Sequence, residues 1–561
     1  MKFSEMPYER VDIELLKTSY NALTNQVKTA ETAQDVIAAL MEHEELMRRS
    51  DTMMSLAYTR NTIDTEDEFY DAERNFYDEE GPALQEVMQE FMLALYESKF
   101  RPALEERFGA LMFKNMEIDL KTFTPEIIPD LQTENALKNE YQKLMASAQI
   151  EFDGKTLNIS QLGPYKENPD REIRKSAYLA DGAFYNANAD ELDRIYDELV
   201  KCRTTIAKKL GYDSFTEVAY LRQCRNCYDA TMVAQFRKQI VDEIVPIVVQ
   251  LKKEQAERIG LTPSEMRIYD DPFRYSEGNP KPMGTPKDIL AAGKKMYEEM
   301  SPETAEFINF MYNNELLDVE TKPKKAPGGY CTSFAEYRAP FIFSNFNGTT
   351  GDVDVLTHEA GHAFAAYTSR NTELMENANP TMESCEVHSM AMEFFAWPWL
   401  NLFYGDDADR ARKMHLESAL IFLPYGTMVD HFQHIIYGNP NLTPAQRHEE
   451  WLKLESIYRP YIDFDNLPFY GEGRVWQRQL HIYQYPFYYI DYCLAQTVAL
   501  DFWRLTQEKY PDAWQKYQNF LSLAGTKTFT DLCAASNLLT PFQQNALKST
   551  AAKVKEWLAG R

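Results

Sequence analysis

The sequence predicts a mainly α-helical protein with a small β element. Apolar residues recur at helical spacing from about residue 11 to 108 and from 170 to about 258, and helical patterning dominates again after Pro380. Strand-like patterning is confined to two short stretches, 150–159 and 330–347. Because 44% of the residues are hydrophobic and 13% are aromatic, the chain can build a sizeable globular core.

Charge and composition narrow the class of protein. The chain has 59 basic and 86 acidic residues, so its formal net charge is −27 and it should repel nucleic acid and anionic membranes. We find no run of 18 apolar residues and no secretory signal, and the seven cysteines are scattered. We therefore expect a cytoplasmic protein that binds neither nucleic acid nor membrane. Its oligomeric state is not indicated by the sequence.

The first helical stretch carries a clear apolar stripe. Leu84, Val87, Met88, Phe91 and Leu95 follow the i, i+3, i+4, i+7 spacing. Side chains at this spacing lie on one face of a helix, so the stripe predicts an amphipathic helix here.

A β-hairpin is predicted where this helical patterning is interrupted. Between residues 150 and 159, apolar and polar residues alternate about the pair Asp153-Gly154, which is the sequence signal for a two-residue turn. Further along, residues 271–287 are rich in proline and glycine, which predicts a surface loop or a boundary. Thr285 followed by Pro286 then predicts a helix start, with the threonine as the cap.

A second β element is predicted at residues 340–346, ending at Asn347-Gly348. This stretch is too apolar and aromatic for a loop, and it directly precedes the most informative helix of the chain. Two roles remain open for it. Either the strand has a purely structural role, or its free backbone groups bind an extended peptide.

The most informative helix contains a His-Glu-x-x-His motif. His358 and His362 are four residues apart, so on a helix they lie on one face and can bind a single Zn²⁺. Glu359 points to one side of this pair, where it can take a proton from water without being a ligand. Gly361 lies inside the motif, and its missing side chain would let another backbone or a substrate come close.

A hydrolytic zinc site needs a third protein ligand and leaves one position for water. The segment 383–393 offers Glu383, Glu386 and His388. Helical geometry alone does not choose among these three residues.

The segment 328–393 resembles the thimet oligopeptidase and oligoendopeptidase F family of zinc peptidases. The matching pieces are Gly328-Gly329-Tyr330, Ser344-Asn345-Phe346-Asn347-Gly348, His358-Glu359-Ala360-Gly361-His362 and Glu386-Val387-His388-Ser389-Met390. The resemblance implies one Zn²⁺ per chain, held by His358, His362 and Glu386. It also implies that Glu359 is the general base. Glu393 is a candidate for orienting a ligand histidine, or is a plain structural glutamate.

The resemblance extends to a second group of residues near the C-terminus. In this family a histidine and several tyrosines on a glycine-containing segment are thought to steady the oxyanion. The match here begins with Gly471 and Gly473, which are candidate hinge residues. It continues with the candidate oxyanion donors, which are, in order of preference, His481, Tyr492, Tyr485 and Tyr488. A tyrosine hydroxyl or a histidine N–H can donate to a developing negative charge.

The resemblance further implies two helical lobes around a deep substrate cleft. We place a helical N-terminal lobe at residues 1–185 and a helical catalytic lobe at 186–561. The expected activity is zinc-dependent endopeptidase cleavage of short, unstructured oligopeptides. Two alternatives stay open: a helical peptide-binding or scaffold protein with a structural metal, and a zinc exopeptidase.

Overall fold

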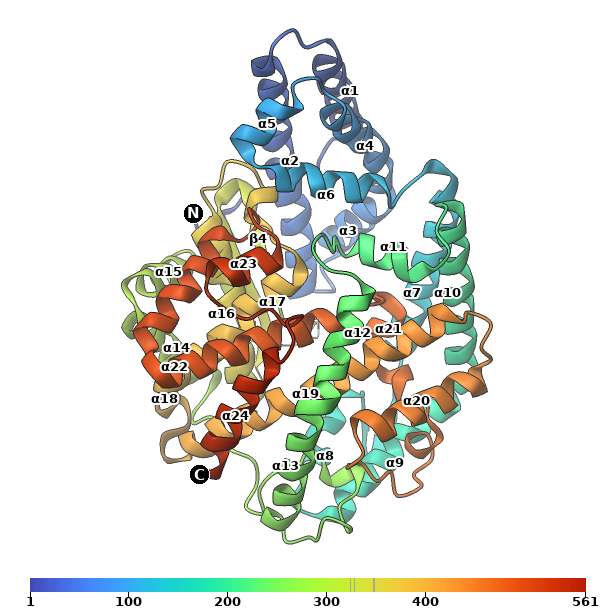
Figure 1. Cartoon of the computed structure of the whole chain (residues 1–561), viewed down its shortest axis with the longest axis vertical. Helices are drawn as coiled ribbons and strands as arrows, with labels where there is room; N and C mark the ends of the chain where they lie inside the picture. Colours follow the sequence, from blue (N-terminus) through green and yellow to red (C-terminus); the bar gives the residue numbers. More distant parts are fainter. Residues whose placement is uncertain (323, 327, 347–348, 561) are drawn as a thin grey trace. The chain divides into compact units, whose positions relative to one another are not determined.

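The computed structural model describes residues 1–322, 324–326, 328–346 and 349–560, and helices dominate it (Figure 1). Within these residues the strands form two small sheets, one of two strands and one of three. The predicted mainly α class is therefore confirmed. None of the described helices combines the length and the apolar character that a membrane span requires.

The chain divides into two compact units, each assembled from separate segments. Unit 1 contains Met1–Lys121, Lys281–Ala408 and Val498–Thr540, and unit 2 contains Thr122–Pro280, Asp409–Thr497 and Pro541–Arg561. These units differ from the predicted lobes at 1–185 and 186–561, because each unit takes residues from both sides of that boundary. Where the functional lobes divide stays a prediction.

Unit 1 holds most of the N-terminal helices and a three-stranded sheet. Its helices are α1 (Ile13–Thr29), α2 (Ala33–Ile63), α3 (Glu68–Glu80), α4 (Pro82–Tyr96), α5 (Arg101–Phe108), α6 (Ala110–Leu120), α14 (Pro286–Met300), α15 (Pro302–Asn313), α16 (Gly351–Ser369), α17 (Met382–Phe395), α18 (Asn401–Tyr404) and α23 (Phe529–Ala535). Its strands are β3 (Leu317–Glu320), β4 (Tyr330–Phe334) and β5 (Ala339–Phe346).

Unit 2 holds the hairpin and most of the remaining helices. Its elements are β1 (Ile150–Phe152), β2 (Lys155–Leu157), α7 (Ile128–Ala146), α8 (Gly163–Lys166), α9 (Arg171–Ala187), α10 (Ala189–Lys209), α11 (Phe215–Arg222), α12 (Ala230–Gln239), α13 (Val245–Arg258), all but the first residue of α19 (Ala408–Gly438), α20 (Pro444–Tyr458), α21 (Leu480–Gln484) and α24 (Ala546–Ala559). Helix α22 (Tyr489–Leu523) begins in unit 2 and continues in unit 1, with a kink at Lys509 two residues before Pro511.

The N-terminal helices of unit 1 pack around one hydrophobic core. Helices α1, α2 and α4 contact one another in this core (Figure 1). The predicted stripe lies on α4, where Leu84, Phe91 and Leu95 are buried and Val87 and Met88 pack partly buried against the core. Leu374, from the connection between α16 and α17, is also part of this core. That connection is thereby anchored to the N-terminal helices.

The three-stranded sheet lies beside α16 and has the order β3-β5-β4. Strand β5 pairs in parallel with β3 and antiparallel with β4, so it is the central strand. The strand predicted at 340–346 is confirmed. It is paired on both sides only at Ile342 and Phe343, because β4 pairs with residues 339–343 and β3 with residues 342–346. A role of this strand in binding an extended peptide stays a prediction. Asn347 and Gly348, where the strand was expected to end, lie outside the described residues.

Two local predictions in the middle of the chain are confirmed. Strands β1 and β2 pair antiparallel, and both turn residues, Asp153 and Gly154, have positive φ, as the tightest hairpin turns require. Thr285 accepts a hydrogen bond from the backbone N–H of Asp288 and caps α14, whose first residue is Pro286. The nearby loop also contains a unit boundary, between residues 280 and 281.

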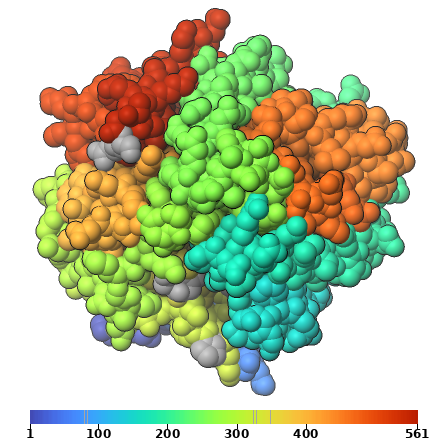
Figure 2. Space-filling view, turned by 90° about the horizontal axis from the view of Figure 1, so that it is seen from below, coloured from blue at the N-terminus to red at the C-terminus, as the bar shows by residue number. Residues whose placement is uncertain are grey.

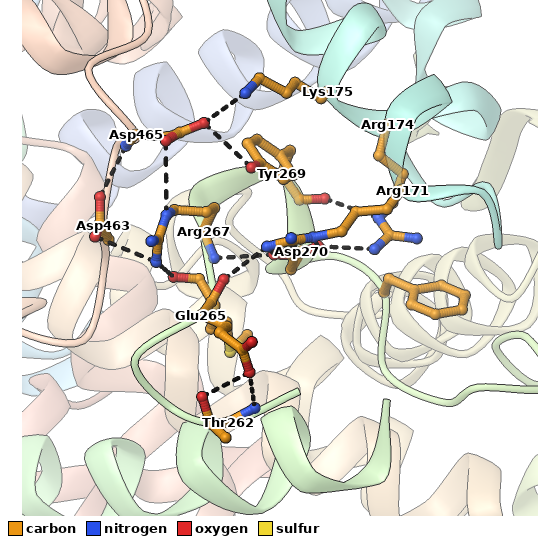
Figure 3. Close-up of polar contacts among 12 residues, drawn as sticks. Arg171, Arg174, Lys175, Thr262, Glu265, Arg267, Tyr269, Asp270, Asp463 and Asp465 are labelled. Atoms are coloured by element: carbon orange, nitrogen blue, oxygen red, sulfur yellow. Dashed lines mark hydrogen bonds and ion pairs between the residues drawn. The ribbon is translucent and has the colours of Figure 1, made fainter. Parts of the chain in front are cut away.

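Unit 2 is held together by ion pairs between distant segments. Its cyan and green segments lie against each other on one face (Figure 2), and Figure 3 shows the polar contacts there. Arg171 and Arg174 on α9 contact the buried carboxylate of Asp270 at 2.8 and 2.7 Å. Lys175 contacts Asp465 at 2.8 Å. The buried carboxylate of Asp270 needs such partners, and these contacts join α9 to the short 3-10 helix Ile268–Asp270 and to the segment around Asp465.

Candidate metal centre

Helices α16 and α17 approach each other closely at one glycine. A Cβ atom on Gly361 would lie 2.6 Å from the Cα of Ser389 and 2.7 Å from the backbone oxygen of His388. Real side-chain carbons do not approach backbone atoms so closely. The predicted close approach is therefore confirmed, and the partner is the backbone of α17.

This packing brings His358, His362 and Glu386 together. The Oε2 atom of Glu386 lies 3.4 Å from Nε2 of His358 and 3.6 Å from Nε2 of His362. One ligand atom from each of the three residues lies within 4.8 Å of the other two. Two imidazole nitrogens and one carboxylate oxygen form a donor set that zinc and related divalent ions accept. The three residues thus fit a divalent metal ion.

The charges at this group are strongly coupled. Burial opposes ionisation of Glu386, but the two histidines outweigh it and hold the pKa of this carboxyl well below its usual range. Burial likewise disfavours the charged form of His358, yet hydrogen bonds with Glu386 and Glu393 raise its pKa well above its ordinary value. Glu386 is thus kept ionised, which is the state that a metal ligand requires.

Glu393 orients one of the two imidazoles. Its Oε1 atom lies 2.7 Å from Nδ1 of His358. Donation from Nδ1–H to this carboxylate leaves Nε2, on the other side of the ring, facing Glu386. Carboxylates in this position fix the ring orientation of metal-binding histidines.

Glu359, next to His358 on α16, is 8% exposed. Burial raises the pKa of its carboxyl group, and His358 and His362 partly counteract this. A carboxylate with a raised pKa binds a proton more readily than an ordinary one, so Glu359 is suited to accept a proton.

The two other candidate ligands point elsewhere. Glu383 is buried and accepts a hydrogen bond from the hydroxyl of Thr381 at 2.5 Å. His388 is 2% exposed, its ring packs on Phe520, and burial lowers its pKa to about 3. Within the described residues, neither Glu383 nor His388 belongs to the group of converging donors.

The predicted oxyanion donors form a second group, which lies in unit 2. The ring of His481, on α21, contacts the rings of Tyr485, Tyr488 and Tyr492, with centroids 6.4, 5.7 and 5.9 Å away. Tyr489 approaches it more closely, at 4.7 Å, and was not predicted. The sequence of residues 481–492 contains several tyrosines, and their spacing alone does not show which of their rings contact His481.

The predicted hinge glycines differ from each other. Gly473 has φ +76°, and a Cβ on it would lie 2.3 Å from the backbone oxygen of His448. Gly471 has no such steric requirement, since its nearest neighbour would be 3.4 Å away. Gly473 is thus required by packing, and a hinge role for either residue stays a prediction.

The structure also brings together His43, Glu44 and Glu376, which the sequence analysis missed. Nε2 of His43 lies 4.0 Å from a carboxylate oxygen of Glu376. Burial, reinforced by the charge of Glu376, raises the pKa of Glu44 to about 8. A hydrogen bond with His43 helps to lower the pKa of Glu376 despite its burial, so the proton of this pair is on Glu44. His43 and Glu44 are adjacent on α2, and nothing in the sequence links them to a residue more than 300 positions away.

Fold and donor set together define a class, the mainly α-helical proteins whose His-Glu-x-x-His helix and a second helix present a donor set for a divalent metal ion. The chain belongs to peptidase family M3, because the family model matches residues 164–282 and 296–551. A second match covers residues 3–123 and is described as the peptidase M3 N-terminal domain. The resemblance noted in the sequence is thereby confirmed.

Individual relatives agree with this assignment. Oligopeptidase PepF of Bacillus subtilis (strain 168) is 23% identical over 536 residues, which cover 89% of this chain and 77% of the relative. PZ peptidase A, solved with an inhibitor, is 47% identical with a TM-score of 0.95, over 100% of this chain and 99% of the other. A protein provisionally described as oligoendopeptidase F is 46% identical over the same shares, also with a TM-score of 0.95.

Proposed function

We propose that this protein is a zinc-dependent endopeptidase that cleaves short, unstructured oligopeptides. The observation that carries the proposal is the convergence of His358, His362 and Glu386, with Glu359 beside them on the same helix as the histidines. Membership of peptidase family M3 supports the same reaction class. The name of the relative oligopeptidase PepF supports the substrate class.

His358, His362 and Glu386 would hold one zinc ion per chain. When bound, zinc supplies Lewis acidity, which acidifies water and polarises a carbonyl group. Glu393 keeps the proton of His358 on Nδ1, so that Nε2 is available as a donor atom.

Glu359 acts as the general base in this proposal. Its buried carboxylate accepts a proton from the attacking water and passes it to the nitrogen of the leaving amine. The raised pKa of Glu359 supports this role, because a carboxylate whose pKa lies closer to neutral pH accepts a proton more readily.

His481 and Tyr492 act as hydrogen-bond donors to the carbonyl oxygen as it becomes negatively charged, with Tyr485 and Tyr488 as further candidates. The clustering of these rings around His481 supports a common role. Two helical lobes around a deep cleft, divided near residue 185, remain part of the proposal, since such a cleft would admit peptides and exclude folded proteins. The cytoplasmic location expected from the sequence also remains part of it.

The decisive experiment is Glu359→Gln. We expect kcat for an oligopeptide to fall by about 10²–10⁴-fold, because a general base is lost, while the bound metal per chain stays unchanged. Metal content and turnover are measured on the same sample. Glu373→Gln is the matched control, since Glu373 is half exposed and pairs with Arg107, and it should leave both values unchanged. Wild-type turnover in Glu359→Gln would overturn the proposal.

Peptides blocked at both ends test the two alternatives. An endopeptidase cleaves them, because it does not recognise a free terminus. An exopeptidase leaves them intact but cleaves the unblocked peptides. A binding or scaffold protein retains both kinds of peptide without cleaving either, which equilibrium binding and mass spectrometry of the same mixture would reveal.

A further inference from the structure

We propose that Gln479, supported by Tyr425, is a positioning residue that holds His481 in the tautomer with its proton on Nε2. The inference rests on the proposed function, in which His481 donates a hydrogen bond to the developing oxyanion. It goes further by naming the atom that donates and the residues that keep a proton there.

Gln479 lies between Tyr425 and His481 in a chain of hydrogen bonds. The hydroxyl of Tyr425, on α19, donates to Oε1 of Gln479 at 2.8 Å. Nε2 of Gln479 lies 2.8 Å from Nδ1 of His481. A carboxamide accepts at its oxygen and donates at its nitrogen, so a donor on the oxygen side directs an N–H toward the ring.

Tyr425 is suited to be the donor in this chain. Burial raises the pKa of its phenol, so the hydroxyl keeps its proton. The guanidinium of Arg459 lies over the Tyr425 ring, 5.0 Å from its centroid, and a cation on the ring face favours donation by the hydroxyl.

The tautomer of His481 follows from this orientation. A neutral imidazole carries one proton, and a ring nitrogen that accepts from an amide N–H has none. The proton must then be on Nε2, which can donate at any pH where the ring is neutral. The rotated amide, with Oε1 toward the ring, would require Nδ1–H and would leave Nε2 unable to donate. The two orientations of the amide therefore predict opposite tautomers of His481, with the proton on Nε2 in one and on Nδ1 in the other.

Buried contacts hold the chain that follows this ring. Arg203 donates to the carbonyl oxygens of Ile482 and Tyr483. Arg225 donates to the carbonyl oxygen of Phe487 at 2.5 Å and to Asp491 at 2.9 Å. Both guanidinium groups are fully buried. Because the backbone is held independently, a change at Gln479 should act on the imidazole and not on the course of the chain.

The groups around His481 influence how its imidazole binds protons. Among the described residues, the titratable groups whose rings contact its ring include Tyr485, Tyr488, Tyr489 and Tyr492. The charged groups that act on Tyr425 are Arg459, Arg478 and Glu455. A carboxylate introduced at position 479 would face Nδ1 directly, raise the pKa of His481 and draw a proton onto Nδ1.

The test is Gln479→Glu, followed through the pH profile of kcat. Below the raised pKa the ring is doubly protonated and Nε2 still donates, so kcat should stay within about 10-fold of wild type. Above this pKa the neutral ring carries its proton on Nδ1, so Nε2 can no longer donate. The value of kcat should then fall by about 10²-fold relative to wild type, because one oxyanion donor is lost. The loss thus grows as the pH rises. A ratio of variant to wild type that is constant with pH would overturn the inference.

Nitrogen NMR of labelled histidine gives a readout that does not depend on activity. Wild-type His481, assigned by comparison with His481→Ala, should show the Nε2–H form when neutral, and Gln479→Glu should show Nδ1–H. An Nδ1–H form in the wild type would overturn the inference. Tyr425→Phe should weaken the preference, whereas Tyr458→Phe, which removes a comparable contact to His431, should not change the His481 signals. An altered His481 signal in Tyr458→Phe would count against a specific role for Tyr425.

The same variants separate this inference from the proposed function. If His481→Ala retains wild-type turnover, the oxyanion role of His481 is wrong, while the NMR result still decides whether Gln479 sets its tautomer. If His481→Ala loses turnover but Gln479→Glu keeps the wild-type pH profile, the proposed role stands and the positioning role of Gln479 fails.

Discussion

Glu386 shows how much of the candidate site depends on single residues. The i, i+4 spacing of His358 and His362 is enough to predict that they share a helix face, because helix geometry is local. The choice among Glu383, Glu386 and His388 is not local, because it depends on how α17 is rotated against α16. In the structure Glu386 faces both histidines, while His388 is buried against Phe520.

At this scale Glu393 provides the first prediction. Glu393→Gln keeps the shape of the side chain but removes the negative charge that holds Nδ1–H of His358. We expect the affinity for zinc to fall by about 10-fold, the lower end of the range for such supporting groups. Competition with a chromophoric chelator measures it. Glu306→Gln, at a side chain that is 69% exposed, should leave the affinity unchanged. Equal affinities in Glu393→Gln and the wild type would show that Glu393 does not support the ligand.

At the scale of elements, the site is built by one helix pair and by the anchoring of their connection. The absence of a side chain at Gly361 allows α16 and α17 to approach, and this contact sets the distance between the histidines and Glu386. The connection between the helices is tied to the N-terminal core through Leu374 and to α2 through Glu376. Elements far from the motif in sequence therefore contribute to its geometry.

Gly361→Ala tests the importance of this helix contact. The added methyl group would meet the backbone of Ser389 at 2.6 Å, so α16 and α17 must separate. We expect a net loss of about 1–3 kcal/mol, since overpacking outweighs the better helix propensity of alanine, and a weaker metal site. Thermal unfolding and metal titration measure the two effects. Gly351→Ala, in the same helix but with its nearest neighbour at 3.4 Å, is the control. A Gly361→Ala protein as stable as that control would contradict the close contact.

The pair of Glu44 and Glu376 predicts a pH-dependent stability. The folded state raises the pKa of Glu44 to about 8 from an ordinary value of 4.5. A carboxyl with a raised pKa stabilises the fold while protonated, so this contribution is complete below pH 4.5 and is lost as the pH rises through 8. Glu44→Gln stays neutral, so its stability relative to wild type should increase between pH 5 and pH 8, by on the order of 1–3 kcal/mol.

Thermal unfolding across this pH range measures the effect of Glu44→Gln, and Glu45→Gln, exposed on the same helix, is the control. If His43, Glu44 and Glu376 held a metal ion instead, the glutamine would destabilise the protein at every pH above the ordinary carboxyl pKa.

At the scale of the whole molecule, each compact unit is assembled from three segments of the chain. The metal group lies in unit 1, whose N-terminal helices share a core of buried apolar side chains that includes Leu374. Such a core is large enough to fold without a metal ion, in contrast to small domains that depend on one.

Removal of the metal should therefore abolish activity and preserve the fold. We expect dialysis against a chelator to stop peptide cleavage, with the far-ultraviolet circular dichroism unchanged and Tm lowered only modestly by the lost binding energy. Adding zinc back should restore turnover. Global unfolding in the chelator would instead identify the metal as structural and favour the scaffold alternative.

The sequence by itself determined the features that depend on local spacing. These are the mainly helical class, the hairpin at Asp153-Gly154, the cap at Thr285, and the pairing of His358 with His362 on one helix face. Only the tertiary structure decided that β5 is a doubly paired central strand, that Glu386 faces the histidines, and that Gln479 contacts His481. The reason is physical. Helix periodicity, turns and caps are governed by neighbours along the chain, whereas strand order, helix rotation and side-chain partners depend on how distant segments pack.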